Sequence, residues 1–375
     1  MPVDANLNSN NVRSIGVVMF GLMGDVILRT PLLREIRRAF PQATITCIVD
    51  PVGRDVLELS ASVDCLIHTN RKLSGFSYLL EKLKLQLRVT AARFDLLIDF
   101  YGGASSAGLV ALSCAKHRMI VRDATVTSNT PKRGNLSRPE AKNPFHTING
   151  AFEILRFFDY PNKSVDTSPE LDCAIKSNEN WRFSLEMPGT NFYVVSLGSG
   201  DSRKYINCST LSQLCRWLFS RHHLIPVIVQ NPGQEGLQQD LSGLLEKFRV
   251  PHRNLPALLL GDLSLILLDS RFLIVPDTGL FHFGLALRIP VLGVFTYTHP
   301  LLVTPDNRVV EFCFREDLES NTTLGGLPVG TPDLSVRGLI RSCKALLTRI
   351  EKIPSTISTN VNTPTSIGHK NAQHQ

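Results

Sequence analysis

Residues 14–40 read SIGVVMFGLMGDVILRTPLLREIRRAF. The stretch opens with a short apolar run of strand length, continues through a turn that contains two glycines, and ends in residues whose apolar positions recur at helical spacing. Thr30-Pro31 predicts the start of the main helix, with a short turn over 24–29 before it. A strand, a glycine turn and a helix in this order are the repeating unit of a parallel α/β sheet.

The same alternation continues along the chain. Further strand-length apolar runs occur as TITCIV, VDCLIH, FDLLIDF and HRMIV, and later as FYVVSLG, IPVIVQ, FLIVP and VLGVF. Between and after them we expect helices over 31–40, 76–93, 105–115, 150–159, 209–222, 234–248, from 280 onward, and over 333–352. Buried strands that alternate with helices predict an α/β fold with two Rossmann-like domains facing each other across a cleft.

Changes in composition indicate where these domains begin and end. We expect a disordered N-terminal tail over 1–13, a first domain over 14–165, a linker over 166–190, a second domain over 191–352 and a disordered C-terminal tail over 353–375. Residues 123–149 are polar and irregular, which predicts a long basic loop at the end of the first domain.

The composition narrows the class of protein. Hydrophobic residues make up 43% of the 375 and charged residues 19%, as in ordinary globular proteins. The longest apolar stretch is interrupted by charges, which argues against a transmembrane helix, and the N-terminus does not resemble a secretion signal. The cysteines show no metal-ligand spacing. We therefore expect a cytoplasmic protein with reduced thiols and no bound metal.

The formal net charge of +7 is concentrated in the first half. Residues 1–165 hold 21 Lys and Arg against 14 Asp and Glu, while the remaining residues balance. Such an excess suits an anionic partner, although a solvated basic surface explains it equally well. No aromatic-rich strand motif or DNA-binding helix pattern accompanies the charge, so we expect no nucleic-acid partner.

Residues 272–295, FLIVPDTGLFHFGLALRIPVLGVF, contain the strongest local signal. A buried strand ends at Pro276, and a helix begins after Asp277, Thr278 and Gly279, with His282 in its first turn. Free backbone N–H groups at such a helix start favour phosphate oxygens. An ordinary capped helix would have the same sequence. Because the DTG triplet occurs once, the paired carboxylates of an aspartic protease are not expected.

Two further turns carry candidate catalytic residues. Asp25 lies at a helix start where an anion would otherwise bind, so it is either a helix cap or a base that takes a proton from a hydroxyl. Lys204, in SGDSRKYIN after another strand, is either a solvated loop lysine or a cation that neutralises a leaving phosphate. The glycine pattern GxGxxG of dinucleotide-binding folds is absent around Asp25, which argues against hydride transfer.

These stretches, in this order, resemble the ADP-heptose:lipopolysaccharide heptosyltransferase family, glycosyltransferase family 9. The resemblance covers roughly residues 14–310 and rests on GLMGDVILRTPLLREIRRAFPQATITCIVD, FDLLIDFYGG, GSGDSRKYI and VPDTGLFHFGLALRIPVLGVF. It implies a GT-B fold and inverting, metal-independent transfer of heptose or a related sugar from an ADP-sugar to a lipopolysaccharide-core acceptor. The nucleotide-sugar would be a substrate, and no cofactor is implied.

The resemblance also assigns roles to matching residues. Asp25 would be the general base, Lys204 would face the donor phosphates, and the second domain would bind the ADP-sugar through Asp277, Thr278, Gly279 and His282, with Ser199 and Glu235 matching more loosely. The first domain would meet an anionic acceptor at the inner membrane surface. Candidate contacts there are Arg54, Arg71, Lys72, Lys132 and Arg133.

One motif departs from the family pattern. Where the family usually has Lys-x-Trp-Pro, this chain has KYIN, with Ile206 and Asn207 in place of Trp and Pro. The difference bears on packing beside Lys204 and on the choice of donor. Two alternatives therefore stay open: a glycosyltransferase of the same fold with another donor or acceptor, and a binding protein that has lost catalysis.

Overall fold

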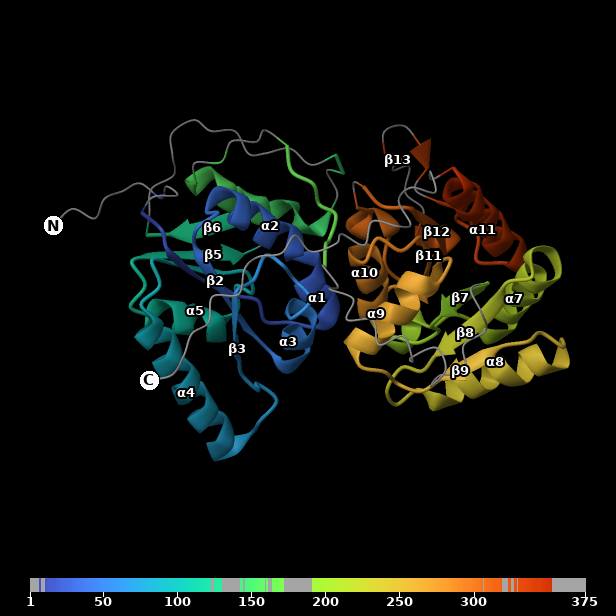
Figure 1. Cartoon of the computed structure of the whole chain (residues 1–375), viewed down its shortest axis with the longest axis horizontal. Helices are drawn as coiled ribbons and strands as arrows, with labels where there is room; N and C mark the ends of the chain where they lie inside the picture. Colours follow the sequence, from blue (N-terminus) through green and yellow to red (C-terminus); the bar gives the residue numbers. More distant parts are fainter. Residues whose placement is uncertain are drawn as a thin grey trace, which may run out of the picture.

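The computed structural model describes residues 7, 11–122, 125–129, 142–143, 146–158, 160, 164–171, 191–305, 307–318, 323–324, 327–328 and 330–352. Two α/β halves lie side by side along the longest axis of the molecule (Figure 1). The predicted C-terminal tail and most of the predicted basic loop lie outside the described residues.

The first half contains a six-stranded sheet in the order β3-β2-β1-β4-β5-β6. Its strands are β1 (Ser14–Val18), β2 (Thr44–Val49), β3 (Cys65–His68), β4 (Leu96–Asp99), β5 (His117–Arg122) and β6 (Thr125–Ser128). The first five pair in parallel, and β6 returns antiparallel to β5. Residues 125–128 were expected in a loop, so the sheet continues one strand further than the sequence predicted.

The second half repeats this order with β12-β11-β10-β7-β8-β9, all parallel. Its strands are β7 (Phe192–Val195), β8 (Ile225–Val229), β9 (Arg253–Leu255), β10 (Leu273–Pro276), β11 (Val291–Phe295) and β12 (Val310–Phe314), and a short hairpin, β13 (Thr323–Leu324) and β14 (Leu327–Pro328), stands apart. Both sheets therefore have the strand order of the Rossmann fold, which confirms the predicted fold class.

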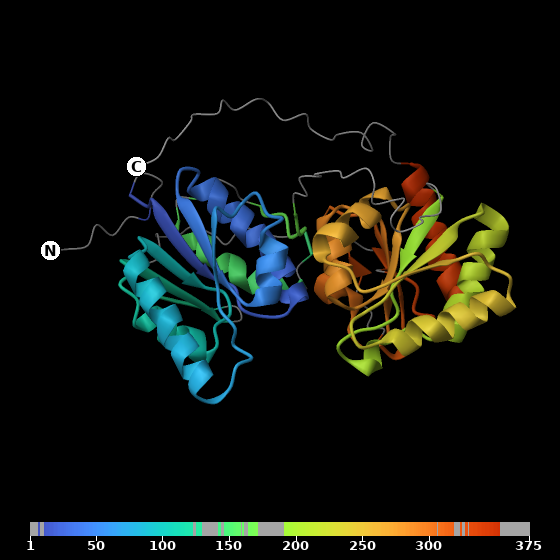
Figure 2. The same cartoon turned by 60° about the horizontal axis from the view of Figure 1, so that its bottom comes forward.

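Helices cover both faces of each sheet (Figure 1, Figure 2). In the first half they are α1 (Met23–Leu28), α2 (Thr30–Ala39), α3 (Pro51–Leu57), α4 (Gly75–Ala92), α5 (Ala104–Ala111) and the 3₁₀ segment η1 (Thr147–Phe157). In the second they are η2 (Ser202–Lys204), α7 (Cys208–His222), α8 (Glu235–Lys247), α9 (Leu260–Asp269), α10 (Gly279–Ala286), η3 (Pro300–Val303), η4 (Glu316–Leu318) and α11 (Val336–Glu351). No helix in the described ranges is both long and apolar enough to cross a bilayer.

The central strands are buried along almost their whole length. In β1 only Ser14 retains partial exposure, and in β10 and β11 every residue is buried. This follows from the architecture, because a parallel sheet covered by helices on both faces has no side that meets water. Apolar burial of this kind is the main source of the free energy of folding.

The N-terminal segment contributes to the first core. Leu7 and Val12 are buried, and the backbone of Arg13 pairs both with the carboxylate of Asp95 and with the amide of Thr44. Part of the segment expected to be a disordered tail therefore packs against the sheet. The reason is that the chain enters β1 alongside β2 and β4, where an apolar side chain such as Val12 can be buried.

A short extended segment, residues 164–171, joins the two halves by contacting both. Arg34 of α2 donates to the carbonyls of Asp166, at 2.5 Å, and Ser168, at 3.1 Å. On the other side, Arg308 donates to the carbonyl of Pro169 at 2.5 Å, and Leu171 N–H donates to the carbonyl of Ala286 in α10. This part of the predicted linker thus holds α2 and the second half in a fixed relation.

Candidate active site

The site forms where the N-termini of two helices meet. Each helix follows a central strand of its own sheet: α1 comes after β1 and α10 after β10, so both begin at the carboxyl edge where ligands bind in this fold. The two helices pack against each other across the junction of the halves. A Cβ atom added to Gly279 would lie 2.5 Å from Cε of Met23, and one added to Gly24 would lie 3.0 Å from Cδ2 of His282. Glycine at both positions permits this approach.

Asp25 lies in the first turn of α1, and its side chain is exposed. One carboxylate oxygen accepts a hydrogen bond of 3.0 Å from the backbone N–H of Leu22, so the residue caps its own helix as one of the two sequence interpretations expected. The carboxylate also acts electrostatically on Arg29 and on His282 of the second half. Asp25 therefore caps α1 and lies close enough to the second half to influence His282 electrostatically.

Asp277 and Lys204 form an ion pair beside α10. The ammonium nitrogen of Lys204 lies 2.6 Å from a carboxylate oxygen of Asp277, whose side chain is only 10% exposed. The capping of α10 is done by Thr278 instead, whose hydroxyl accepts from Leu280 N–H at 3.2 Å. The structure thus brings Asp277, Thr278, Gly279 and Lys204 together, and it places Lys204 on a carboxylate that sequence reasoning did not pair with it.

Two buried histidines lie behind the helix tip. Burial lowers the pKa of His282 to about 4, although the carboxylates of Asp277 and Asp25 act in the opposite direction. His146, just before η1, is buried too, and burial together with the proximity of His282 lowers its pKa to about 4. Within the described residues, Nδ1 of His282 and Nε2 of His146 have no hydrogen-bond partner. Both side chains are therefore neutral near pH 7, and each keeps a free nitrogen for hydrogen bonding.

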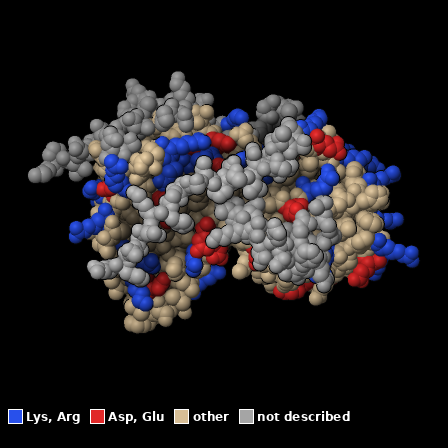
Figure 3. Space-filling view, viewed as in Figure 1, with Lys and Arg blue, Asp and Glu red and all other residues tan. Residues whose placement is uncertain are grey.

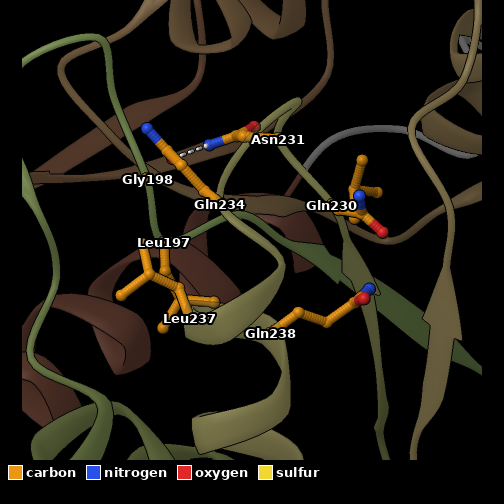
Figure 4. Close-up of a pocket in the computed structure, with 8 residues that line it drawn as sticks. Leu197, Gly198, Gln230, Asn231, Gln234, Leu237 and Gln238 are labelled. Carbon is orange, nitrogen blue, oxygen red and sulfur yellow. Dashed lines mark hydrogen bonds between the residues drawn. The ribbon is translucent and has the colours of Figure 1, made fainter.

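A small pocket opens at the carboxyl ends of β7 and β8 (Figure 4). Its walls include Gly198, Asn231 and Gln234, and Asn231 Nδ2 donates to Gln234 Oε1 at 3.2 Å. Gln234 also donates to the carbonyl of Ser199 at 2.6 Å. A Cβ at Gly198 would lie 1.6 Å from Gln234 Oε1, so any side chain there would displace the end of Gln234 from its present position. Ser199 thus contacts Gln234 of the pocket wall through its backbone carbonyl.

Glu235 lies at the start of α8, next to this pocket, with its side chain exposed. Its carboxylate accepts from Gln230 Nε2 at 2.7 Å and from Gly233 N–H at 3.3 Å. These two bonds hold the turn between β8 and α8 in shape. Among the described residues, the hydrogen-bond partners of the Glu235 carboxylate are therefore residues of its own turn.

The KYIN segment that departs from the family pattern has a clear local structure. Ile206 is buried in the core of the second half, where it takes the apolar position beside Lys204. Asn207 is the N-cap of α7, and its side-chain oxygen accepts from Thr210 N–H at 3.0 Å. Tyr205 accepts a hydrogen bond from Gln234 at 3.0 Å. The two residues that differ from the family pattern therefore anchor the chain just after Lys204, Ile206 in the core and Asn207 as a helix cap.

Arg71 is anchored at the carboxyl edge of the first sheet. Its guanidinium binds both carboxylate oxygens of Asp50, at 2.8 and 2.7 Å, and stacks over the rings of Phe20 and Tyr101. Asp50 in turn accepts from Gly21 N–H at 3.2 Å, in the glycine turn before Asp25. This arrangement fixes Arg71 beside the glycine turn, and its role in acceptor binding stays a prediction.

The other predicted acceptor residues are spread more widely. Arg54 lies on the exposed surface of α3 in an ion pair with Glu58, and Lys72 is exposed in the turn before α4. Lys132 and Arg133 lie outside the described residues. In the view of Figure 3, Lys and Arg side chains are scattered over both halves rather than gathered in one patch. The charge excess of the first half therefore does not by itself mark a binding surface on this face.

Sequence reasoning missed several residues of the site: Arg29, Asp50, Asp99 and His146. Asp50 directly follows the apolar run of β2, and Asp99 is the last residue of β4. An acidic residue at the carboxyl end of a parallel strand is a recognisable signal of a site residue.

Two of these side chains have shifted pKa values. Burial raises the pKa of Asp99, although the backbone amides of Gly102 and Tyr101 act in the opposite direction. Burial lowers the pKa of Arg29, against the pull of Asp25 and Asp99. No local sequence pattern identifies His146 as a site residue.

No three His, Cys, Asp or Glu side chains of the described part of the chain are grouped as a metal ion would require. Asp25, Asp50 and Asp99 each have N–H partners of their own. Metal-free chemistry stays a prediction.

Comparison with known proteins identifies the family. The model of the family described as glycosyltransferase family 9 (heptosyltransferase) matches residues 82–324, which is more than half of the chain. No curated protein matches. Among solved structures, a glycosyltransferase family 9 protein from Veillonella parvula has a TM-score of 0.73 at 18% identity, covering 92% of this chain and 99% of its own.

Two heptosyltransferases of E. coli share the fold. WaaC, solved with ADP, has a TM-score of 0.63 at 18% identity, and ADP-heptose lps heptosyltransferase II has a TM-score of 0.65 at 15% identity. Each alignment covers 90% of this chain and 99% of the other. The two sheets, their paired helix tips and the family match agree: the chain is a glycosyltransferase with the GT-B fold and belongs to glycosyltransferase family 9.

Proposed function

We propose that this protein transfers heptose, or a closely related sugar, from an ADP-sugar to the core of a lipopolysaccharide acceptor, with inversion at the anomeric carbon and without a metal ion. The observation that carries the proposal is the meeting of α1 and α10, in which Gly24, the residue before Asp25, lies against His282 and Gly279, and the carboxylate of Asp25 acts electrostatically on His282. A base on one half and an anion-binding helix start on the other are what this transfer needs.

The reaction would proceed by direct displacement. A hydroxyl oxygen of the acceptor attacks the anomeric carbon from the face opposite ADP, the bond from that carbon to the phosphate oxygen breaks, and Asp25 accepts the hydroxyl proton. ADP leaves with the bonding electron pair. Lys204 and the N-terminus of α10 would stabilise the added negative charge, as preorganised donors do at a developing anion. These two groups would supply the positive charge for which other glycosyltransferases use a metal ion.

The pairing of Lys204 with Asp277 adds a step to this scheme. In the structure the ammonium group is neutralised by a carboxylate 2.6 Å away. A diphosphate that enters beside Gly279 would compete for the same ammonium, which has three N–H donors and can contact both anions. We infer that donor binding turns Lys204 partly toward phosphate while Asp277 keeps it in place.

Two observations support the proposed substrates: the ligands of solved structures with the same fold, and the positive charge of Arg71. WaaC of E. coli was solved with ADP and with an ADP-heptose analogue, and this chain shares its fold. The anchored guanidinium of Arg71, next to the glycine turn, suits a phosphate or acidic sugar on the acceptor. Because such an acceptor is lipid-linked, the proposed site of action is the cytoplasmic face of the inner membrane.

The direct test is a turnover assay with the purified full chain. ADP-heptose and a lipopolysaccharide core that lacks heptose are incubated with the protein, ADP release is followed, and the product is analysed by mass spectrometry and by NMR at the new anomeric carbon. We expect one added heptose with inverted configuration and an unchanged rate in the presence of a chelator. Loss of activity with the chelator would contradict the metal-free mechanism.

A second candidate function is binding without catalysis. It is favoured by the ion pair that occupies Lys204 and by the KYIN segment in place of the usual motif. Calorimetric titration with ADP separates it from the first. ADP binding accompanied by no transfer from ADP-heptose, with core acceptors of several lengths, would favour the binding protein, whereas transfer to any of them would eliminate it.

A further inference from the structure

Helix α4 lies on the outer side of the first sheet, away from the second half (Figure 1, Figure 2). Among its residues only Leu85 and Val89 are buried, so the helix is attached along a narrow strip. Gln86 and Thr90 extend this attachment through hydrogen bonds to the carbonyls of Leu109 and Leu112 in and after α5.

The opposite face of α4 is apolar and exposed. Phe76 is 80% exposed, Leu79 60%, Leu83 55% and Leu87 61%. Positions separated by three, four and four residues lie on one side of an α-helix, so these side chains form a continuous stripe. Leu112, next to this helix, is 70% exposed as well. A contiguous apolar surface of this kind marks an interaction site.

Cationic side chains border the stripe on both sides. At 100° per residue, Lys82 lies along one edge of the stripe, and Lys84 and Arg88 lie along the other, all three exposed. The acidic residue of this helix, Glu81, accepts hydrogen bonds from Thr69 and Asn70. An apolar face bordered by lysine and arginine is the pattern of a helix that lies in the interface of an anionic membrane.

A groove connects this helix with the candidate active site. It has a volume of about 100 Å³, and its lining includes Leu85 of α4 as well as Phe20 and Arg71. Arg71 is the residue held by Asp50 beside the glycine turn. Lys82, which borders the stripe, also lines this groove, so the stripe adjoins the groove that reaches Arg71.

We propose that α4 docks this protein on the surface of an anionic phospholipid bilayer. Phe76, Leu79 and Leu83 insert at the level of the upper acyl chains, and Lys82, Lys84 and Arg88 contact the lipid phosphates. A second copy of the chain fits less well, because in a two-fold dimer through α4 the cations of one helix would face the same cations of the other. The docking extends the proposed function, since it would present the groove to a lipid-linked acceptor.

Vesicle sedimentation tests the docking without turnover, so its outcome is separate from that of the proposed transfer. The full chain is mixed with phosphatidylcholine vesicles that contain about one third phosphatidylglycerol, and with vesicles of phosphatidylcholine alone. We expect binding to the anionic vesicles only, weakening with added salt. The triple variant Phe76→Ser, Leu79→Ser, Leu83→Ser should bind on the order of 1,000-fold more weakly, since each of the three apolar side chains contributes roughly tenfold.

The matched control is Leu259→Ser, which replaces a leucine that is 77% exposed on the second half and should leave binding unchanged. Because all four replaced side chains are exposed, the variants should keep the wild-type circular dichroism spectrum. As an independent readout, Phe76→Trp should be quenched by bromine-labelled lipid. Wild-type binding by the triple variant, or absence of quenching, would overturn the proposal. So would a wild-type dimer in sedimentation velocity that the triple variant dissociates, which would assign the face to a second copy.

Discussion

Lys204 and Asp277 show how a single contact can serve both structure and chemistry. The carboxylate is nearly buried and the ammonium is its ion-pair partner at 2.6 Å. Lys204→Met removes the cation that would stabilise the leaving diphosphate and leaves the carboxylate of Asp277 without its partner. We expect kcat for sugar transfer to fall by about 10²–10³-fold, the usual effect of removing one preorganised donor, and ADP binding to weaken.

The preceding residue offers a matched control for this variant. Arg203 lies on the same 3₁₀ turn but is exposed, and it pairs with Asp201 and stacks on Tyr297 at the surface. Arg203→Met should therefore leave kcat close to that of the wild-type protein. Equal losses in the two variants would mean that the turn as a whole matters and that Lys204 has no specific role.

His282 and His146 make stability depend on pH. Burial lowers the pKa of both side chains to about 4, whereas an unfolded histidine titrates near 6.5. Between these values the unfolded chain binds protons that the folded chain does not, so stability is complete above about pH 6.5 and falls as the pH decreases toward 4. We expect a lower urea midpoint at about pH 5 than at about pH 7.5, and a smaller difference in the His282→Gln variant. An identical difference in both proteins would exclude His282 as a source.

At the level of elements, the contact of α1 with α10 depends on glycine. A Cβ at Gly279 would lie 3.0 Å from Cβ of Met23 as well as against the end of that side chain. Gly279→Ala should destabilise the protein by about 1–3 kcal/mol, as overpacking of a close contact does, and should lower the transfer rate by separating the two helix tips. Denaturant unfolding and the ADP-release assay measure the two effects.

Gly243 provides the comparison, because it lies inside α8 with no atom within 4 Å of an added Cβ. Gly243→Ala should raise the free energy of unfolding by about 0.5–1 kcal/mol, the difference in helix propensity, and leave transfer unchanged. A lower free energy of unfolding in Gly243→Ala would show that the room for a Cβ atom does not determine how a glycine-to-alanine change affects stability in this protein.

Several elements could be predicted from the sequence because their residues report burial directly. The apolar runs of β1, β2, β10 and β11 lie in parallel sheets covered on both faces, so their strands read as unbroken hydrophobic segments. The helix after Thr30-Pro31 also begins as predicted, although the hydroxyl of Thr30 does not cap it. That hydroxyl donates to the carbonyl of Ile27 and accepts from Glu170 N–H in the linker.

Other elements were missed for identifiable reasons. The edge strand β9 has only 3 residues, too few for a pattern. Residues 125–128 have polar composition and become a strand only by pairing with β5. The segment 147–157 forms 3₁₀ turns where the sequence predicted a helix. In each case contacts with residues distant in the sequence determine the structure, and these contacts cannot be read from the local sequence.

For the whole molecule, the relation of the two halves depends on the segment 164–171. Arg34 is largely buried, with 13% of its side chain exposed, and it donates to Asp166, Ser168 and Glu170. Arg34→Ala should lower the free energy of unfolding by about 1–3 kcal/mol, because several charge-assisted hydrogen bonds are lost in a buried setting. Differential scanning calorimetry measures the change.

The control is Arg54→Ala, which removes an exposed ion pair within α3 and should leave the melting temperature unchanged, as surface pairs contribute little. If Arg34→Ala had the same melting temperature as Arg54→Ala, the contacts of Arg34 with segment 164–171 would not hold the two halves together.

The candidate site itself could be predicted only in part. Asp25 and the Asp277–His282 stretch were recognised by their motifs, and the structure places them on facing helix tips. The ion pair of Lys204 with Asp277 joins residues 73 positions apart, and the site of Arg71 depends on Asp50 and on the rings of two further residues. Such partners are set by how loops from different strands meet at the sheet edge, which no single motif records.

The proposed mechanism depends on Asp25 taking the proton of the acceptor hydroxyl. Asp25→Asn is nearly isosteric and keeps an oxygen that can accept from Leu22 N–H, so α1 should stay capped. The decisive measurement is the single-turnover rate of transfer from ADP-heptose, together with ADP affinity by calorimetry. We predict a rate reduced by about 10²–10⁴-fold with unchanged ADP affinity. Transfer at the wild-type rate by Asp25→Asn would exclude Asp25 as the base.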